Sequence, residues 1–185
     1  MYRELDSKEG VMDPRYPIGK FEWSGSVTDE QRRQFVAQIE ETPARLREAV
    51  HGLSEQQLDT PYRDGGWTVR QVVHHLADSH MNAFVRFKLA LTEDQPTIKP
   101  YNQDLWVSTP DAKAFPVDTS LNLLVSLHAR LVALLRSMTP RDFARTFNHP
   151  ESGINTLEKY VALYAWHGRH HVAHISSLKG RMGWK

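Results

Sequence analysis

Residues 68–91 read TVRQVVHHLADSHMNAFVRFKLAL, and this stretch decides the fold class. It opens with Thr68 and Gln71 at the spacing of a capping box, in which each side chain accepts a hydrogen bond from the other residue's backbone N–H. Apolar residues then recur at intervals of three and four as far as Leu91. That spacing predicts one amphipathic helix of about six turns.

Three further stretches show helical spacing, and they are residues 28–53, 118–138 and 156–179. Pro43 lies inside the first of them and has no backbone N–H, which predicts a kink or a break there. The last stretch runs out into Gly180 and Gly183, the residue type that ends helices. Residues 92–116, with four prolines, are predicted to form a long irregular connection.

These patterns predict an all-α protein. Four helices that each carry one apolar stripe bury those stripes together in a four-helix bundle. One connection is long, so simple up-and-down topology does not follow from the pattern. The predicted organisation is an N-terminal arm, residues 1–27, followed by a bundle domain, residues 28–185.

Composition limits the function. The chain has 185 residues, a net charge of +1 and no cysteine. This length predicts one domain, and a balanced charge lacks the basic surplus typical of nucleic-acid binding. The absence of cysteine excludes disulfides, cysteine metal ligands and a cysteine nucleophile. With no signal peptide and no apolar run of about 18 residues, we expect a soluble cytoplasmic protein that binds a small molecule and neither nucleic acid nor membrane.

Histidine is the unusual residue of this chain, which holds ten. Seven fall in two groups, His74, His75 and His80 in the first and His167, His170, His171 and His174 in the second, whereas His51, His128 and His149 are interpreted as structural or surface residues. His167 and His171 are four residues apart, so their imidazoles lie one helical turn apart and can reach one ion. Because bundle cores build metal sites from facing helices, two histidine-rich helices predict such a site.

A helical wheel orders the histidines on each helix. The apolar stripe of the last helix consists of Leu157, Val161, Tyr164, Ile175 and Met182. His171 lies in this stripe, His167 and His174 lie on its flank, and His170 lies furthest out. On residues 68–91, His80 lies on the apolar face and His75 lies to one side. The wheel alone therefore favours His80 as a third ligand.

The pair His167 and His171 has the His-x-x-x-His spacing of zinc peptidases. Those enzymes place a catalytic glutamate directly after the first histidine, but here that position is Gly168. The peptidase mechanism is therefore excluded. A glycine inside a helix costs about 1 kcal/mol relative to alanine, so Gly168 predicts a close approach by another backbone or a ligand.

Four motifs resemble the YfiT branch of the DinB superfamily. They are PYRDGGWTVRQVVHHLADSHMN at 61–82, WHGRHHVAHI at 166–175, RMGW at 181–184 and YPIG at 16–19, and the resemblance covers about residues 16–184. It implies a DinB-type four-helix bundle that holds one divalent ion, zinc or alternatively nickel, on three histidines. By the family's motif these are His75, which precedes Leu-Ala-Asp, together with His167 and His171. The resemblance also implies a homodimer.

The resemblance implies a metal-dependent hydrolase. Three neutral imidazoles leave a divalent ion with an open position, where it lowers the pKa of bound water or binds a thiol as thiolate. The alternative activity is therefore a metal-dependent thiol transferase, which activates a low-molecular-weight thiol such as bacillithiol. A third hypothesis is a non-enzymatic stress-response bundle with a structural metal, in which His74 or His80 closes the site.

Other residues are weaker candidates for the chemistry. Asp78 is the candidate general base, since hydrolysis needs a carboxylate near the metal. Arg169 and His174 are candidates for binding an anionic group of the substrate. Tyr101 and Trp106 in the long connection either cover the pocket or belong to the core.

Overall fold

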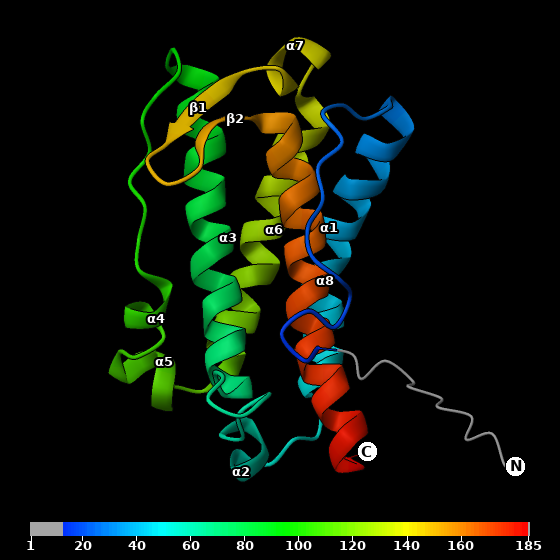
Figure 1. Cartoon of the computed structure of the whole chain (residues 1–185), viewed down its shortest axis with the longest axis vertical. Coiled ribbons are helices and arrows are strands. Elements are labelled where there is room, and N and C mark those ends of the chain that lie inside the picture. The colour runs from blue at the N-terminus through cyan, green and yellow to red at the C-terminus, as the bar shows by residue number, and fades with distance from the viewer. Residues whose placement is uncertain (1–12, 185) are drawn as a thin grey trace, which may run out of the picture.

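Four long helices form the body of the molecule (Figure 1). The computed structural model describes residues 13–184. The long helices are α1 (Asp29–Val50), α3 (Val69–Thr92), α6 (Val117–Ser137) and α8 (Leu157–Met182). The shorter elements are α2 (Glu55–Leu58), α4 (Gln103–Trp106), α5 (Pro110–Ala114), α7 (Pro140–Phe143), β1 (Thr146–His149) and β2 (Gly153–Thr156). The predicted helical bundle is confirmed.

Local signals in the sequence set the helix ends. Thr68 and Gln71 form the predicted capping box of α3, with Gln71 Oε1 accepting from the Thr68 N–H at 2.8 Å and Thr68 Oγ1 accepting from the Gln71 N–H at 3.2 Å. A second capping box starts α1 at Thr28. Gly183 ends α8 with a left-handed φ of 65°, a conformation that favours glycine.

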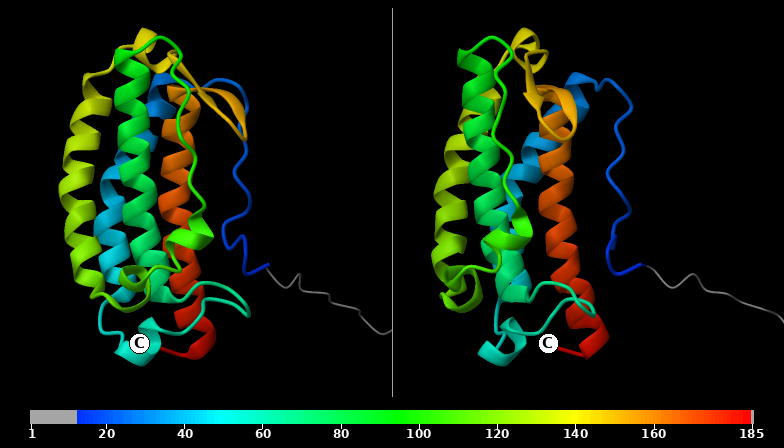
Figure 2. Two further views of the ribbon diagram at one scale, coloured as in Figure 1. Left: turned by 90° about the vertical axis from the view of Figure 1, so that its left-hand side faces the viewer. Right: turned by 60° about the vertical axis from the view of Figure 1, so that its left-hand side comes forward.

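The long connection determines the topology. Each long helix packs against two of the others, in the cyclic order α1, α6, α3, α8. The colours in Figure 1 show that α1 and α8 run downwards whereas α3 and α6 both run upwards. The chain must therefore return along the outside of the bundle between α3 and α6, and residues 93–116 do this (Figure 2). The bundle consequently departs from simple up-and-down order.

Three details of the predicted pattern were wrong. The connection contains the two short helices α4 and α5, and a small antiparallel hairpin, β1 with β2, precedes α8. A kink or a break was predicted at Pro43; helix α1 continues through this residue, so the break does not occur. Met182, assigned to the buried stripe of α8, is 53% exposed because the last turn of α8 extends past the bundle.

The core has two apolar clusters with a polar layer between them. The first cluster includes Ile39, Phe87, Leu131 and Val161, and the second includes Leu46, Leu76, Leu124 and Ile175. Each long helix contributes to both clusters. The stretch of each helix between the clusters carries buried polar side chains, among them Thr42 on α1, His80 on α3, His128 on α6 and His171 on α8. This layer contains the candidate site.

Helix α6 is long and apolar enough to span a bilayer by length and composition alone. It packs against α1 and α3, and it buries Leu121, Leu124, Leu131 and Leu135 in that contact. Its place in the bundle core accounts for its apolar content.

Candidate metal centre

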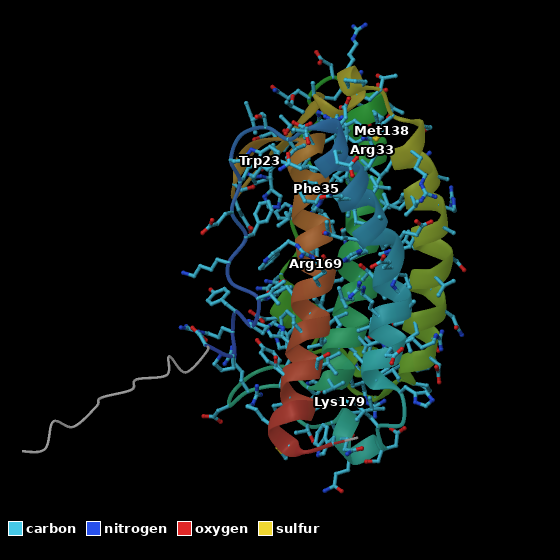
Figure 3. The ribbon with its side chains drawn as sticks, turned by 90° about the vertical axis from the view of Figure 1, so that its right-hand side faces the viewer. Trp23, Arg33, Phe35, Met138, Arg169 and Lys179 are labelled. Carbon is cyan, nitrogen blue, oxygen red and sulfur yellow. The ribbon has the colours of Figure 1, made fainter. Side chains whose placement is uncertain are left out.

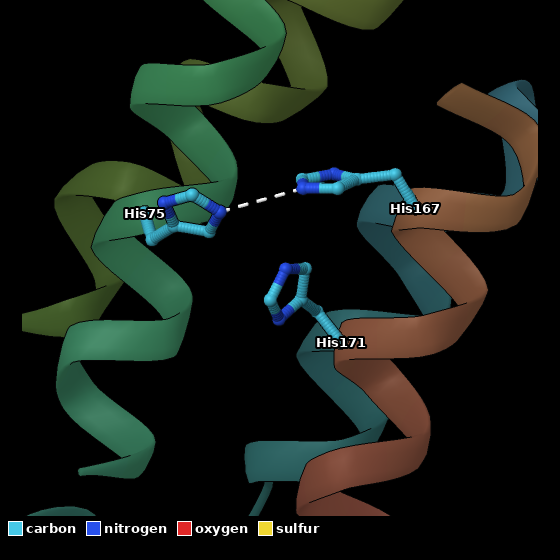
Figure 4. A group of neighbouring side chains, drawn as sticks. All are labelled: His75, His167 and His171. Atoms are coloured by element: carbon cyan, nitrogen blue, oxygen red, sulfur yellow. Dashed lines mark hydrogen bonds between the residues drawn. The ribbon is translucent and has the colours of Figure 1, made fainter. Parts of the chain in front are cut away.

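Three histidines converge in the polar layer between α3 and α8. His75 comes from α3, and His167 and His171 come from successive turns of α8 (Figure 4). One ring nitrogen of each lies within 4.8 Å of the corresponding nitrogens of the other two, and the Nε2 atoms of His75 and His167 are 3.4 Å apart. His75 and His171 are buried, and His167 is half-buried. The structure thus brings together the three residues that the family motif singles out.

Burial keeps these imidazoles neutral. It lowers the pKa of His75 to about 3, and the nearby His174 lowers it further as the smaller cause. Burial is also the main reason that the pKa values of His167 and His171 lie well below their usual range, with the neighbouring histidines adding to the effect. A neutral imidazole is the form that binds a metal ion, so the site is in its metal-binding state at neutral pH.

The spacing between the His75 and His167 nitrogens fits a divalent ion. Zinc binds histidine nitrogen at about 2.0–2.1 Å in tetrahedral geometry, which places two ligand nitrogens about 3.3–3.4 Å apart. The His75 and His167 nitrogens meet this spacing. In the part of the chain that the structure describes, no other histidine and no carboxylate joins this group. A three-ligand set keeps a position open for a further ligand.

A cavity of about 560 Å³ gives access to His167 and His171, and His75 lies behind them without lining it. Its walls come from the N-terminal arm with Arg15 and Tyr16, from the loop with Tyr62 and Trp67, and from α4 and α8. The centroid of the Trp67 ring lies 4.6 Å from that of the His75 ring. The Trp67 ring is also nearly parallel to the His171 ring, with 6.2 Å between their centroids. Its Nε1–H donates to Asp104 at 3.0 Å, which fixes the long connection at the cavity wall.

Sequence reasoning named the histidines His167, His171 and His174 of the wall but missed its aromatic residues, although one local signal was available. Trp67 directly precedes the capping box of α3, so it lies just before the helix that carries His75. The arm gave no such signal, because it reaches α8 through contacts between residues far apart in sequence. Tyr16 approaches His170 at 6.3 Å and Phe21 approaches Trp166 at 5.9 Å between ring centroids. Figure 2 shows residues 13–27 of the arm running beside α8, whereas residues 1–12 of the predicted arm lie outside the described residues.

His80 was the third ligand favoured by the helical wheel, and it lies outside the group of three. It is completely buried, as the wheel indicated. Its ring stacks on His128 at 4.8 Å, and its Nε2 lies 3.2 Å from Nδ1 of His167, on the side of that ring turned away from His75. His80 is therefore a neighbour of a candidate ligand. His74 is also engaged elsewhere, with Ser120 Oγ and the Phe115 carbonyl.

The arm explains why the wheel misplaced His170. The wheel put this residue furthest from the apolar stripe, yet it is only 7% exposed. Trp166 stacks on the His170 ring at 4.3 Å, and Tyr16 of the arm lies beyond it. His174 is also buried and lines the cavity, with its ring stacked on Tyr62 at 4.0 Å.

The remaining candidates lie away from the cavity walls. Arg169 is exposed on the outer face of α8 (Figure 3), where its Nε–H donates to the Ala165 carbonyl at 3.1 Å. It does not line the cavity, so its proposed contact with substrate gains no support. Tyr101 and Trp106 pack on one another at 4.4 Å, and Trp106 is 38% exposed, so it belongs neither to the core nor to this cavity wall.

Asp78 lies one turn beyond His75 on α3 and is half-buried. Burial, together with the charge of Asp111 as a smaller cause, raises its pKa to about 6. A carboxyl with such a pKa can accept a proton near neutral pH. It does not line the cavity, so direct contact with a substrate there gains no support.

We expect Asp78→Asn to stabilise the metal-free protein above pH 6. Because the folded state raises the pKa from 3.8 to about 6, the native state binds more protons across that interval, and wild-type stability falls as the pH rises through it. Asparagine has no charge to bury. The expected gain is about 1 kcal/mol, since solvent screens a half-exposed group. Urea denaturation at about pH 4 and about pH 7.5 measures it, and an equal gain at both values contradicts the assignment.

Gly168 allows α1 and α8 to approach closely next to His167. A Cβ atom on Gly168 would lie 2.5 Å from Thr42 Oγ1 and 2.8 Å from Thr42 Cγ2. Thr42 is buried, and its hydroxyl donates to the Gln38 carbonyl at 2.9 Å. A close approach therefore occurs, but it is made by a side chain of α1 and not by the backbone or ligand that was predicted.

The fold and the site together define a class of protein, a helical bundle with three histidines that could hold one ion in its polar layer. The family model of the DinB superfamily matches residues 38–175, and the chain belongs to this superfamily.

Named relatives support the same assignment. The chain is 56% identical over 174 residues to a protein of Bacillus mycoides named "Putative metal-dependent hydrolase", which covers 94% of this chain and 100% of that protein. A protein of Bacillus thuringiensis with the same name is 55% identical over 172 residues, 93% of this chain and 99% of that one. The solved structure of YfiT from Bacillus subtilis is 51% identical, with a TM-score of 0.91 over 93% of this chain and 99% of that chain. It is described as a probable metal-dependent hydrolase with an unusual four-helix bundle topology.

Proposed function

We propose that this protein is a metal-dependent hydrolase whose centre consists of His75, His167 and His171. The observation that carries the proposal is the convergence of three neutral imidazole nitrogens, two of which, on His167 and His171, belong to residues that line an accessible cavity. The names of its relatives point to the same class. Zinc is the ion we propose, with nickel as the alternative, because both suit imidazole ligands.

The chain's own residues would hold and enclose a small substrate. A divalent ion on three imidazoles makes water or a thiol more acidic at its open position. Trp67, Tyr62 and Tyr16 offer aromatic surfaces around that position, and Arg15 and Arg63 add positive charge to the wall. The cavity volume of about 560 Å³ suits a small molecule and is too small for a folded macromolecule.

Metal removal and return test this proposal. We expect about one divalent ion per chain in the purified protein by elemental analysis. Chelation should reduce the hydrolysis of a panel of nitrophenyl esters and anilides to the background rate, and adding zinc or nickel back should restore it. Hydrolysis that persists after complete metal removal would contradict the proposal.

One observation favours thiol transfer as the second candidate. Asp104 is the only carboxylate among the residues lining the cavity, all of which lie within residues 13–184, and it already accepts a hydrogen bond from Trp67. Hydrolysis needs a general base to take a proton from water. A thiol has an unperturbed pKa of about 8.5 and ionises far more readily, so it needs less help from a base.

A cobalt-substituted sample separates the two activities. If thiol transfer is the activity, a small thiol such as 2-mercaptoethanol should produce a sulfur-to-cobalt charge-transfer band in the near-ultraviolet. The band should disappear in His171→Ala. A spectrum that thiol leaves unchanged would favour hydrolysis.

A further inference from the structure

A chain of three histidines connects the candidate centre to the backbone of α1. Nδ1 of His167 lies 3.2 Å from Nε2 of His80, and Nδ1 of His80 lies 2.9 Å from Nε2 of His128. Nδ1 of His128 then lies 2.7 Å from the carbonyl oxygen of Ile39. His80 and His128 are 0% and 2% exposed, so water has little access to this chain of hydrogen bonds.

The carbonyl end of the chain sets the direction of every hydrogen bond in it. A carbonyl oxygen can only accept, so Nδ1 of His128 carries a proton and donates it to Ile39. A neutral ring has one N–H, so Nε2 of His128 accepts from Nδ1–H of His80. By the same rule Nε2 of His80 accepts from Nδ1–H of His167. The Nε2 atom of His167 then carries a lone pair, which faces Nε2 of His75 at 3.4 Å.

Pro43 makes the Ile39 carbonyl available. In an α-helix the carbonyl of residue 39 accepts from the N–H of residue 43, and proline has none. Helix α1 continues past this point, so the Ile39 oxygen lacks its helical partner, and His128 supplies the missing donor. The proline that the sequence presents as a helix breaker thus creates the acceptor at the end of the chain.

A second, shorter chain ends on His171. Nδ1 of His171 lies 3.4 Å from Nδ1 of His174, and Nε2 of His174 lies 3.2 Å from the carbonyl oxygen of Arg15 in the N-terminal arm. The same reasoning makes His174 donate from Nε2 to the carbonyl and accept from Nδ1–H of His171. Nε2 of His171 then carries a lone pair as well. The hydrogen bond between the two rings is long, so this chain is the weaker of the two.

We propose that these two carbonyl-anchored histidine relays fix the tautomers of His167 and His171, so that both rings keep an Nε2 lone pair for the candidate centre. His80, His128 and His174 are then positioning residues, which hold the ligands through their hydrogen bonds. An unanchored neutral imidazole can carry its proton on either nitrogen. The tautomers follow from the hydrogen bonds alone, but their use in binding a metal rests on the proposed function.

The tautomers can be measured without any metal. Long-range ¹H–¹⁵N correlation spectra of the metal-free wild type, labelled with ¹⁵N-histidine, distinguish Nδ1–H from Nε2–H rings. We expect the proton on Nδ1 of His167, His80, His128 and His171, and on Nε2 of His174. An Nε2–H on His167 or His171 would overturn the proposal. This readout needs no variant, so a variant that fails to fold does not weaken the test.

Two variants then test the consequence for metal binding. His128→Phe keeps the stacking on His80 and His174→Phe keeps the stacking on Tyr62, but each removes both ring nitrogens. In a competition assay with a chromophoric chelator, we expect His174→Phe to weaken metal binding by about 10- to 100-fold, the usual effect of losing a ligand's own hydrogen-bond partner. His128 contacts His167 only through His80, so His128→Phe should weaken metal binding by a smaller factor. His51→Phe, at an exposed position outside both relays, should change nothing.

The outcomes separate the two proposals. Unchanged metal affinity in both variants, with the wild type binding metal, would overturn the relays. The expected tautomers in a wild type that binds no divalent ion would confirm the relays and overturn the metal centre.

Discussion

The His171→Ala variant is expected to bind its divalent ion at least about 100-fold more weakly than the wild type. Four-ligand zinc sites contribute about 10–16 kcal/mol, or about 3 kcal/mol for each ligand, and 1.4 kcal/mol corresponds to a factor of ten in affinity. His75→Ala should lose metal to the same extent. Elemental analysis after dialysis and competition with a chromophoric chelator measure both.

His51→Ala is the matched control, since His51 is exposed, follows the last residue of α1 and is not among the three histidines of the candidate centre. It should keep the wild-type metal content. Wild-type affinity in His75→Ala together with metal loss in His171→Ala would show that another residue is the third ligand. Full metal content in both would contradict the three-histidine centre itself.

The Gly168→Ala variant is expected to lose about 1–3 kcal/mol of unfolding free energy, the typical cost of adding a methyl group to a filled core. The new methyl group would meet two atoms of Thr42 at less than 3 Å. Thr42 cannot rotate away cheaply, because it is β-branched, buried and hydrogen-bonded to Gln38. Since Gly168 is adjacent to His167, we also expect weaker metal binding. Urea denaturation and the chelator competition assay measure the two effects.

Two comparisons isolate the cause. Thr42→Ala removes both close atoms, so the double variant Thr42→Ala with Gly168→Ala should recover most of the metal affinity. Gly180→Ala lies on the same helix with nothing within 4 Å of the added methyl group. It should gain up to about 1 kcal/mol from helix propensity. A loss of stability at Gly180 equal to that at Gly168 would show that the contact with Thr42 is not the cause.

The sequence predicts the parts of this fold that depend on local spacing. The capping residues Thr28 and Thr68 and the periodic apolar positions place the long helices to within a few residues. The hairpin and the short helices were missed because four or five residues contain too little periodicity to identify an element. At Pro43 the local rule predicted a kink or a break, and the break does not occur, since packing in the bundle keeps α1 continuous where an isolated helix would break.

The candidate site shows a similar limit. A helical wheel reports burial, and it was right that His80 is buried. It cannot report in which direction a ring nitrogen points, and that direction separates His75 from His80 in this bundle. His170 was misplaced because the segment that covers it lies about 150 residues earlier in the chain. The family motif supplied the choice of His75 that spacing alone could not.

The arm that runs along α8 has a practical consequence for anyone who shortens this protein. The superfamily match begins at residue 38, inside α1, and a fragment cut near there would lack Arg15, Tyr16 and Phe21. Such a fragment would lose one wall of the cavity and the carbonyl that accepts from His174. The superfamily match therefore begins too late to define a fragment with a complete cavity. A shortened protein should keep the arm from residue 13 onwards.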